Sequence, residues 1–191
     1  GQMRKALAQL QVNSMTNDIP SHITTLLDDI QSTKDAADRE DALQALVETE
    51  NKAAVPPLIA LLDHDKPALR ADAAWALGQF ADVSAVEPLI AVVAADDVYI
   101  RGYAVSSLGN LGDGRAVQPL IDRLTAEDDP IVTDRVIDAL GKLGDARAIE
   151  PLMVLFEAAP VHRPSLAIAL GRLGHTPALE PIKGLLKDDD P

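Results

Sequence analysis

The hydrophobic and polar positions of this chain repeat along most of its length. Five segments share one apolar pattern, and they begin at Val55, Val86, Val117, Ile149 and Leu179. The equivalent prolines of these segments lie 31, 31, 32 and 30 residues apart. After a polar turn, each of the first four is followed by a second segment with apolar residues at helical spacing, for example Leu69, Ala73, Ala74 and Leu77. A period of about 31 residues with two helices per unit predicts an all-α fold, a right-handed α-solenoid.

Glycines and aspartates mark the ends of the predicted helices. The second helix of a repeat is expected to end at Gly78, Gly109, Gly141 or Gly171. A further glycine at 112, 144 and 174 suits a left-handed cap at the C-terminus of the helix. Asp113 and Asp145 follow where an aspartate can cap the next first helix. The equivalent prolines either open that helix or kink it near its start, and the pattern leaves both interpretations open.

The repeats divide the chain into a short N-terminal segment and one domain. We expect residues 1–20 to precede a repeat domain over residues 21–191, with repeats at 22–54, 55–85, 86–116, 117–148 and 149–178 and a half-repeat at 179–191. The first repeat is more polar than the others, as expected of a cap. Met15 is typical of a natural start, so part of residues 1–14 is expected to be additional to the natural protein. The half-repeat either caps the solenoid or continues in a longer chain, and we favour the longer chain.

Composition narrows the fold and the partners. Aromatic residues make up only 3% of the chain, so Ala, Leu, Val and Ile must fill the core, which suits closely stacked helices. A formal net charge of -13 repels phosphate backbones and anionic membranes, and we therefore expect neither nucleic acid nor membrane as a partner. The chain has no cysteine, no apolar run long enough to span a membrane and no apolar stretch typical of a signal peptide. These features favour a cytoplasmic protein.

No group of side chains has the pattern of an active site or a metal site. The four histidines lack the paired spacing and acidic companions of a metal ligand or general base, and we expect solvated positions for His22, His64, His162 and His175. Gly112-Asp-Gly114 follows a predicted helix rather than a strand, which indicates a turn and not a phosphate loop. Acidic pairs such as Asp96-Asp97 lack the spacing of a calcium loop. We assign no catalytic residue, metal ligand or bound cofactor.

Three motifs carry a resemblance to a known family. They are VxPLIxLL at Val55–Leu62, RxxAAxALG in its local form at Arg70–Gly78, and LGDxRA at Leu111–Ala116. Over residues 22–191 the chain resembles the phycobilisome-lyase HEAT-like repeat family. The resemblance implies HEAT-like two-helix repeats, and it implies either a scaffold or a subunit of a bilin lyase, which attaches tetrapyrroles to phycobiliproteins. The chain departs from the pattern at Thr133, where an arginine is expected, and at Pro160 and Pro164 in the fifth repeat.

In such repeats the second helices line a concave groove, and the side chains between their core positions face a partner. The candidate binding residues are Asp72, Trp75, Gln79, Tyr103, Ser106, Asn110, Arg135, Asp138, Lys142 and Arg172. The groove is expected to be acidic near Glu40, Asp41 and Glu48, aromatic in the middle and basic at its late end. Because exposed Trp and Tyr are enriched among interface anchors, we expect Trp75 and Tyr103 to form the centre of binding. The alternative for Trp75 is a core position packed against the next repeat.

One arginine recurs at the same repeat position, at Arg70, Arg101 and Arg163. The spacing suggests a structural role, and we expect these arginines to form ion pairs between repeats with Asp82, Asp113 and Asp145.

Two functions fit these features best. The first is a scaffold that holds a protein partner in the concave groove. The second is a subunit or accessory of a bilin lyase, in which Trp75 and Tyr103 stack on a transiently bound phycobilin and Arg135 or Arg172 pairs with its propionates. In that case the partners are a phycobiliprotein or a second HEAT-like subunit. An independent active site is the least favoured interpretation, because the chain offers no paired nucleophile and base.

Overall fold

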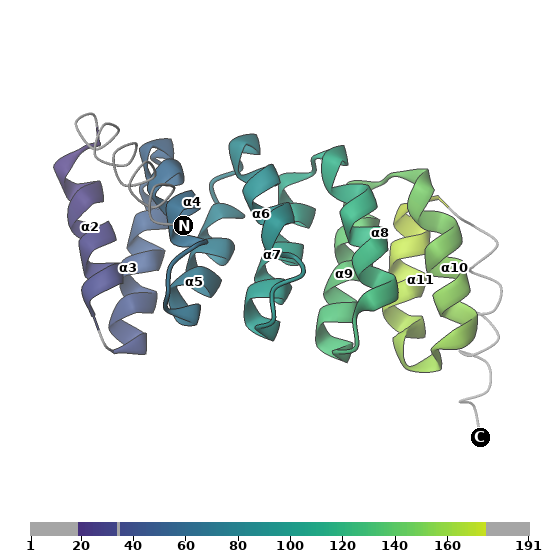
Figure 1. The fold of residues 1–191 in the computed structure, drawn as a ribbon. Helices are drawn as coiled ribbons and strands as arrows, with labels where there is room; N and C mark the ends of the chain where they lie inside the picture. The colour runs from purple at the N-terminus through teal and green to yellow at the C-terminus, as the bar shows by residue number, and fades with distance from the viewer. Residues whose placement is uncertain (1–18, 34, 175–191) are drawn as a thin grey trace, which may run out of the picture.

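The computed structural model describes residues 19–33 and 35–174, and within these ranges the chain forms helices and no strands (Figure 1). The α-helices of this part are α2 (Ser21–Ser32), α3 (Ala36–Glu48), α4 (Val55–Leu61), α5 (Pro67–Leu77), α6 (Val86–Val92), α7 (Val98–Leu111), α8 (Val117–Ala126), α9 (Pro130–Leu143), α10 (Ile149–Ala158) and α11 (Arg163–Arg172). Residues 1–18 and the predicted half-repeat 179–191 lie outside the described residues.

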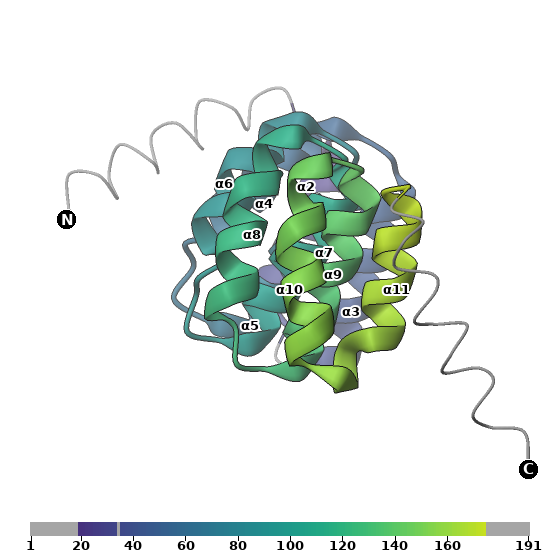
Figure 2. The same ribbon diagram turned by 90° about the vertical axis from the view of Figure 1, so that its right-hand side faces the viewer.

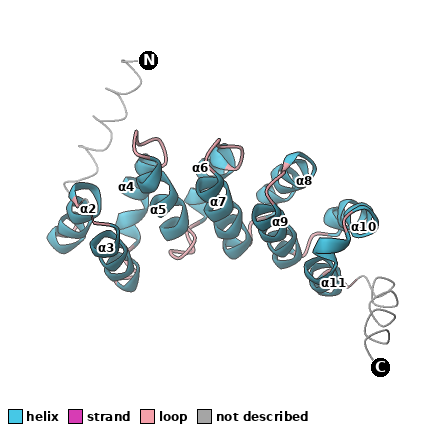
Figure 3. Cartoon of the chain, turned by 90° about the horizontal axis from the view of Figure 1, so that it is seen from below, coloured by secondary structure: helices cyan, strands magenta, loops and turns pink. Residues whose placement is uncertain are grey.

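The helices form two parallel rows. Even-numbered helices make one row and odd-numbered helices the other, as Figure 3 shows from below. In a view along the length of the molecule, successive helices of a row are offset, so that α10 is seen to one side of α8 and α11 to one side of α9 (Figure 2). The two helices of each repeat pack together, and the odd-numbered helices α5, α7, α9 and α11 also pack on their neighbours. The predicted all-α solenoid is confirmed.

A short 3₁₀ turn leads into four of the first helices. The turns are η2 (Lys52–Ala54), η3 (Val83–Ala85), η4 (Gly114–Ala116) and η5 (Ala146–Ala148). The side chain of the residue before each turn accepts a hydrogen bond from the backbone N–H two residues on, as in Asp113 with Arg115 at 2.9 Å. The equivalent prolines are the third residues of α4, α6, α8 and α10. They therefore open the helix in its first turn, where a missing N–H costs least.

Two second helices end at a left-handed glycine, as predicted. Gly112 and Gly144 have φ angles of 68° and 70° and donate their N–H groups to the carbonyls of Leu108 and Leu140. A side chain at such a φ angle is strained, which explains the choice of glycine.

The prediction that the second helices end at Gly109 and Gly141 is wrong. Helices α7 and α9 continue to Leu111 and Leu143. These glycines are instead points of contact between repeats: a Cβ at Gly109 would lie 2.9 Å from Cα and Cβ of Ala139, and one at Gly141 would lie 2.9 Å from the same atoms of Ala169. The absence of a side chain lets neighbouring second helices approach closely.

Leucines at equivalent positions fill the core between the rows. At these equivalent positions the fully buried leucines on the first helices are Leu58, Leu89, Leu120 and Leu152, and those on the second helices are Leu46, Leu77, Leu108, Leu140 and Leu170. Burial of one such side chain stabilises the fold by about 1.5–3 kcal/mol. The repeat pattern thus places the same contact in each unit.

The recurring arginines do not bind the predicted aspartates, although one of them, Arg101, forms an ion pair with Glu127 of the next repeat. Arg101 donates to the carbonyls of Ala95 and Asp96, at 2.9 Å each, and binds both carboxylate oxygens of Glu127. Arg70 similarly donates to the carbonyls of His64 at 2.7 Å and Asp65 at 3.3 Å. Arg163 donates to the carbonyl of Phe156 at 3.1 Å. An arginine in the first turn of a second helix reaches back toward the end of the first helix, where carbonyls lack helical partners.

The aspartates of the predicted pairs have nearer cations. Arg115 binds Asp113 at 2.9 Å, and Arg147 binds Asp145 at 2.8 Å. The side-chain hydrogen bond from each arginine, helped by its backbone N–H, lowers the pKa of each of these carboxyls to about 2. The third aspartate, Asp82, lies 3.7 Å from Lys52. Each aspartate is therefore engaged at the entry to its own first helix.

The fifth repeat keeps its second helix despite its two prolines. Pro160 opens a 3₁₀ turn, η6 (Pro160–His162), and Pro164 lies in the first turn of α11. The prediction of a solvated position is wrong for His162, which is buried with its Nδ1 2.9 Å from Oδ1 of Asp134. His162 takes the repeat position of the buried Leu69 and Ile100, so its surroundings are those of a core residue.

Replacement of Gly109 by alanine is expected to destabilise the protein. Alanine within a helix normally stabilises it by about 0.5–1 kcal/mol relative to glycine, but the added Cβ here would overlap Ala139. We expect a net loss of about 1–3 kcal/mol and a lower thermal midpoint in calorimetry. Gly114→Ala is the matched control, because a Cβ there meets no atom within 4 Å. A Gly109→Ala protein at least as stable as the wild type would contradict the proposed close contact.

Candidate functional site

The odd-numbered helices carry the predicted binding residues on the inner side of a shallow arch (Figure 3). Helix α5 carries Asp72 and Trp75 and is followed by Gln79; α7 carries Tyr103, Ser106 and Asn110; α9 carries Arg135, Asp138 and Lys142; and α11 ends at Arg172. Each of these ten side chains is at least partly exposed. Because α7 and α9 lie between α5 and α11, Trp75 and Arg172 belong to different parts of the groove.

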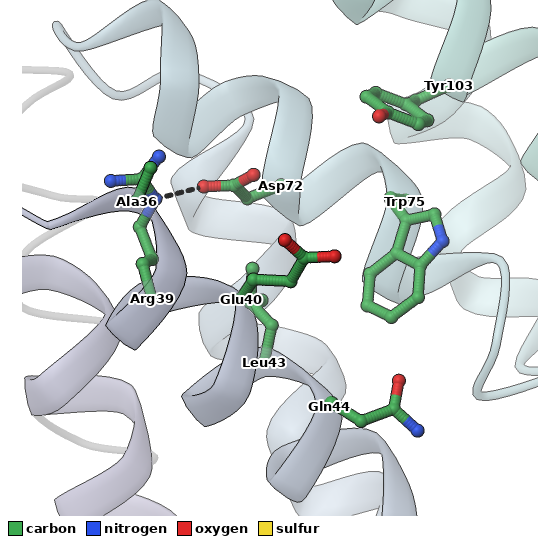
Figure 4. Close-up of a pocket in the computed structure, with 8 residues that line it drawn as sticks. All are labelled: Ala36, Arg39, Glu40, Leu43, Gln44, Asp72, Trp75 and Tyr103. Carbon is green, nitrogen blue, oxygen red and sulfur yellow. Dashed lines mark hydrogen bonds and ion pairs between the residues drawn. The ribbon is translucent and has the colours of Figure 1, made fainter.

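The predicted aromatic centre borders a cleft of about 300 Å³, which we call the aromatic cleft. The cleft is lined by Ala36, Arg39, Glu40, Leu43, Gln44, Asp72, Trp75 and Tyr103. Figure 4 shows that α3 forms one wall, while the indole of Trp75 and the ring of Tyr103 stand on the other side. The structure therefore brings together Asp72, Trp75 and Tyr103 from the predicted set.

The cleft opens where two second helices stay apart. Helices α3 and α5 associate less closely than α5 and α7 do. Val47 occupies in α3 the repeat position that Gly78 occupies in α5 and Gly109 in α7. Since the distance between packed helices depends on the side chains at the contact, a branched residue at this position accounts for the wider gap.

Trp75 combines both roles that its sequence position allows. Its half-buried side chain packs against the hydrophobic core, and its indole also lines the aromatic cleft. The partly exposed Tyr103 likewise contacts the core. A rigid aromatic surface of this kind loses little conformational entropy when a partner covers it. The role of Trp75 in binding remains a prediction.

The charged side chains of the aromatic cleft differ in their engagement. Nε of Arg39 lies 2.5 Å from Oδ2 of Asp72, and both side chains are largely buried. Gln44 donates to Glu48 at 3.1 Å. Glu40 is exposed and forms no hydrogen bond or ion pair with any other described residue. The cleft therefore holds one neutralised pair and one carboxylate without a partner in the described chain.

Tyr103 also borders a second cleft of about 250 Å³, together with Arg135. The guanidinium carbon of Arg135 lies 5.4 Å from the centroid of the Tyr103 ring, within the range of a cation–π contact. Nη1 of Arg135 also donates to the carbonyl of Gly102 at 3.4 Å and to Oγ of Ser106 at 3.3 Å. Arg135 is thus held in place by α7.

The cations at the late end of the groove share one carboxylate. Asp138 binds Lys142 at 3.0 Å and Arg172 at 2.6 Å, and Lys142 also donates to Asn110 at 3.1 Å. Partial burial raises the pKa of Asp138, but the hydrogen bonds and charges of Arg172 and Lys142 outweigh it and lower the pKa below its usual range. The carboxylate of Asp138 therefore offsets one of the positive charges at the predicted basic end. Gln79, beyond the end of α5, is exposed.

Sequence reasoning missed several residues of the two clefts. Arg39 shares its repeat position with Arg70, but its partner Asp72 lies in the next repeat, and spacing alone did not indicate that contact. Tyr99 and Ile131, 69% and 66% exposed, line the second cleft. The sequence contained a signal for both residues, because each is an apolar residue in the first turn of a second helix, one position before a buried core residue.

Two further features are absent from the part of the chain that the structure describes. Across residues 19–33 and 35–174, no group of three or more histidine, aspartate or glutamate side chains is arranged to hold a metal ion. The helices of this same part of the chain include none that is long and apolar enough to cross a membrane.

Comparisons with known proteins agree with this architecture. A family model described as HEAT repeats matches residues 23–101 and 86–163. A solved structure, the complex of CpcE and CpcF of phycocyanin lyase from Nostoc sp. PCC7120, is similar with a TM-score of 0.69 and 26% identity over 88% of this chain and 71% of that chain. The crystal structure of an engineered protein is similar in fold, with a TM-score of 0.56 and 19% identity over 81% of this chain and 80% of that one. A search of the curated proteins finds no match.

Replacement of Asp138 by asparagine is expected to reduce stability in a pH-dependent way. A carboxyl whose pKa is lowered by folding contributes stability above its unfolded pKa and loses it as the pH falls through the folded value. Because Asp138 is 45% exposed, its ion pairs are worth less than about 1 kcal/mol. Asp138→Asn should lower the thermal midpoint by about 1–3 °C at pH 7, and the difference should disappear as the pH falls through the lowered pKa of Asp138.

Asp122→Asn provides the control for this measurement. It makes the same change in charge, and Asp122 accepts a hydrogen bond from Gln118 but binds no cation among the described residues. Equal effects of the two substitutions at pH 7 would show that net charge, and not the ion pairs of Asp138, sets the difference.

Proposed function

Because the chain belongs to the family of HEAT repeats, we propose that it is a scaffold whose concave groove binds a protein partner. The observation that carries this proposal is the aromatic cleft, where Trp75 and Tyr103 stand partly exposed on the inner row of helices. Tryptophan and tyrosine in partly desolvated pockets are frequent anchors of protein interfaces. Their attachment to packed helices favours a preformed binding surface.

The remaining groove residues support a contact surface. Arg135 is held by Tyr103 and Ser106, and Lys142 and Arg172 are held by Asp138. Such fixed polar groups can complement a partner at the rim of an interface without large ordering costs.

A second candidate is an accessory role like that of a lyase subunit. Similarity to the complex of CpcE and CpcF of phycocyanin lyase favours it. In this case Trp75 and Tyr103 would stack on a phycobilin, while Arg135 or Arg172 would pair with its propionates, with a phycobiliprotein or a second HEAT-like subunit as partner. Both arginines already have partners in this chain, which they would have to exchange. The scaffold is therefore the better supported function.

The double variant Trp75→Ala, Tyr103→Ala should lose affinity for the partner of the scaffold. The partner is first captured from the native host on immobilised wild-type chain, identified by mass spectrometry and purified. In titration calorimetry we expect a Kd at least about tenfold higher for the double variant, because each anchor costs more than about 1 kcal/mol when truncated. Val154→Ala, an exposed position on the opposite row, is the control. Unchanged affinity of a folded double variant would remove this proposal.

The lyase-like candidate predicts a change in the visible spectrum of a phycobilin. When the chain is titrated into phycobilin, alone and with a phycobiliprotein acceptor, absorption should shift because a pocket restricts the conformation of the tetrapyrrole. The shift should be lost in Trp75→Ala, Tyr103→Ala and kept in Val154→Ala. The absence of a spectral change under both conditions would exclude this candidate.

A further inference from the structure

The aromatic cleft has the chemistry of a site for a cation. Glu40 contributes the carboxylate that has no partner in the described part of the chain. Trp75 and Tyr103 contribute aromatic rings, whose faces carry negative electrostatic potential. A positive group between them would gain both an ion pair and a cation–π contact.

The nearest internal cation does not fill this position. Figure 4 shows the guanidinium of Arg39 directed at Asp72, to which it is bound at 2.5 Å. Arg39 and Glu40 are successive residues of α3, and successive side chains on a helix do not face each other. The cleft thus contains the carboxylate of Glu40, which has no partner in the described part of the chain, beside the complete ion pair of Arg39 and Asp72.

The chain itself contains the cation–π part of the binding mode that the cleft would offer. Arg135 lies over Tyr103 with its guanidinium carbon 5.4 Å from the ring centroid, and Arg163 lies over Phe156 at 5.5 Å. Tyr103 borders both clefts, so one of the two already holds an arginine against this ring. A guanidinium stacks on an aromatic ring and donates to a carboxylate with the same planar group, which an ammonium does less well.

An anionic ligand is disfavoured at the same place. The one basic side chain that lines the aromatic cleft is Arg39, and its charge is balanced by Asp72. The chain as a whole carries a formal net charge of -13, which attracts basic partners over distances of about a Debye length.

From these observations we propose that the aromatic cleft binds an arginine side chain presented by the protein partner. The carboxylate of Glu40 accepts hydrogen bonds from the N–H groups of this arginine, and Trp75 and Tyr103 contact the planar face of its guanidinium. This inference rests on the proposed scaffold function and adds the chemistry of the partner to it.

A peptide titration observed by NMR tests the site directly. Trp75 is the single tryptophan of the chain, so its indole N–H gives one assigned signal in the ¹⁵N spectrum. The probe is the peptide acetyl-Gly-Gly-Arg-Gly-Gly-amide, and its control contains citrulline, a neutral group of nearly the same shape, in place of arginine. We expect the arginine peptide to shift the indole signal with saturation by about 10 mM, and the citrulline peptide to leave it unmoved.

Matched variants assign the effect to Glu40. Glu40→Gln should weaken binding of the arginine peptide at least about fivefold, because the carboxylate supplies the charge. Glu157→Gln makes the same change in net charge at an exposed position on α10 and should leave the affinity unchanged. No saturable shift, equal shifts from the citrulline peptide, or equal losses in the two variants would each overturn the arginine site.

Binding of the captured partner separates this inference from the proposed function. If partner affinity falls in Trp75→Ala, Tyr103→Ala but is unchanged in Glu40→Gln, the scaffold stands and the arginine site is wrong. If the peptide binds through Glu40 while the affinity for the partner is unchanged in Trp75→Ala, Tyr103→Ala, the proposed scaffold function of this groove is wrong. Both measurements falling together, with substitution of one partner arginine by glutamine reproducing the loss, supports both.

Discussion

Close contact between the second helices of neighbouring repeats is the constraint on which the rest of this structure depends. Gly109 lies against Ala139 and Gly141 against Ala169, with no room for a Cβ at either glycine. At the equivalent junction Gly78 faces Ser107, whose hydroxyl donates to the carbonyl of Ala74 at 2.7 Å. Because small residues meet at one point at each of these three junctions, helices α5, α7, α9 and α11 stack at a short distance and their outer faces form continuous columns.

The columns explain the polar contacts across the groove. When second helices are held close and in register, side chains one repeat apart come within hydrogen-bonding distance. Lys142 of α9 reaches Asn110 of α7, and Arg172 of α11 reaches Asp138 of α9, over separations of 32 and 34 residues. In each of these contacts, a charged or polar side chain of the groove therefore pairs with one from the adjacent repeat. A protein bound in such a groove contacts side chains that are already fixed by one another. New bonds to that protein are expected mainly at side chains that have no partner within the described chain.

The sequence was sufficient to predict the repeats and the helical rows, because these depend on local periodicity and on leucines that recur at one spacing. It also placed Trp75 and Tyr103 on one groove. The failures concern contacts that a single repeat does not determine. Arg101 was expected to bind Asp113, but its side chain binds the carbonyls of Ala95 and Asp96 and the carboxylate of Glu127 in the next repeat, whose side chain is fully buried. Gly109 was interpreted as a helix end, since a glycine in sequence does not reveal whether backbone freedom or close approach requires it.

The first repeat differs from the later ones at the contact between second helices. Val47 stands in α3 where later helices have the contact glycine, and α3 consequently lies less closely against α5. The same separation that weakens this junction opens the aromatic cleft and leaves Glu40 facing it. The exposed carboxylate of Glu40 remains hydrated in the free protein. The free-energy cost of leaving its charge unpaired is therefore small until a partner covers it. One departure from the repeat pattern thus accounts both for the looser end of the solenoid and for the place where a cation is favoured.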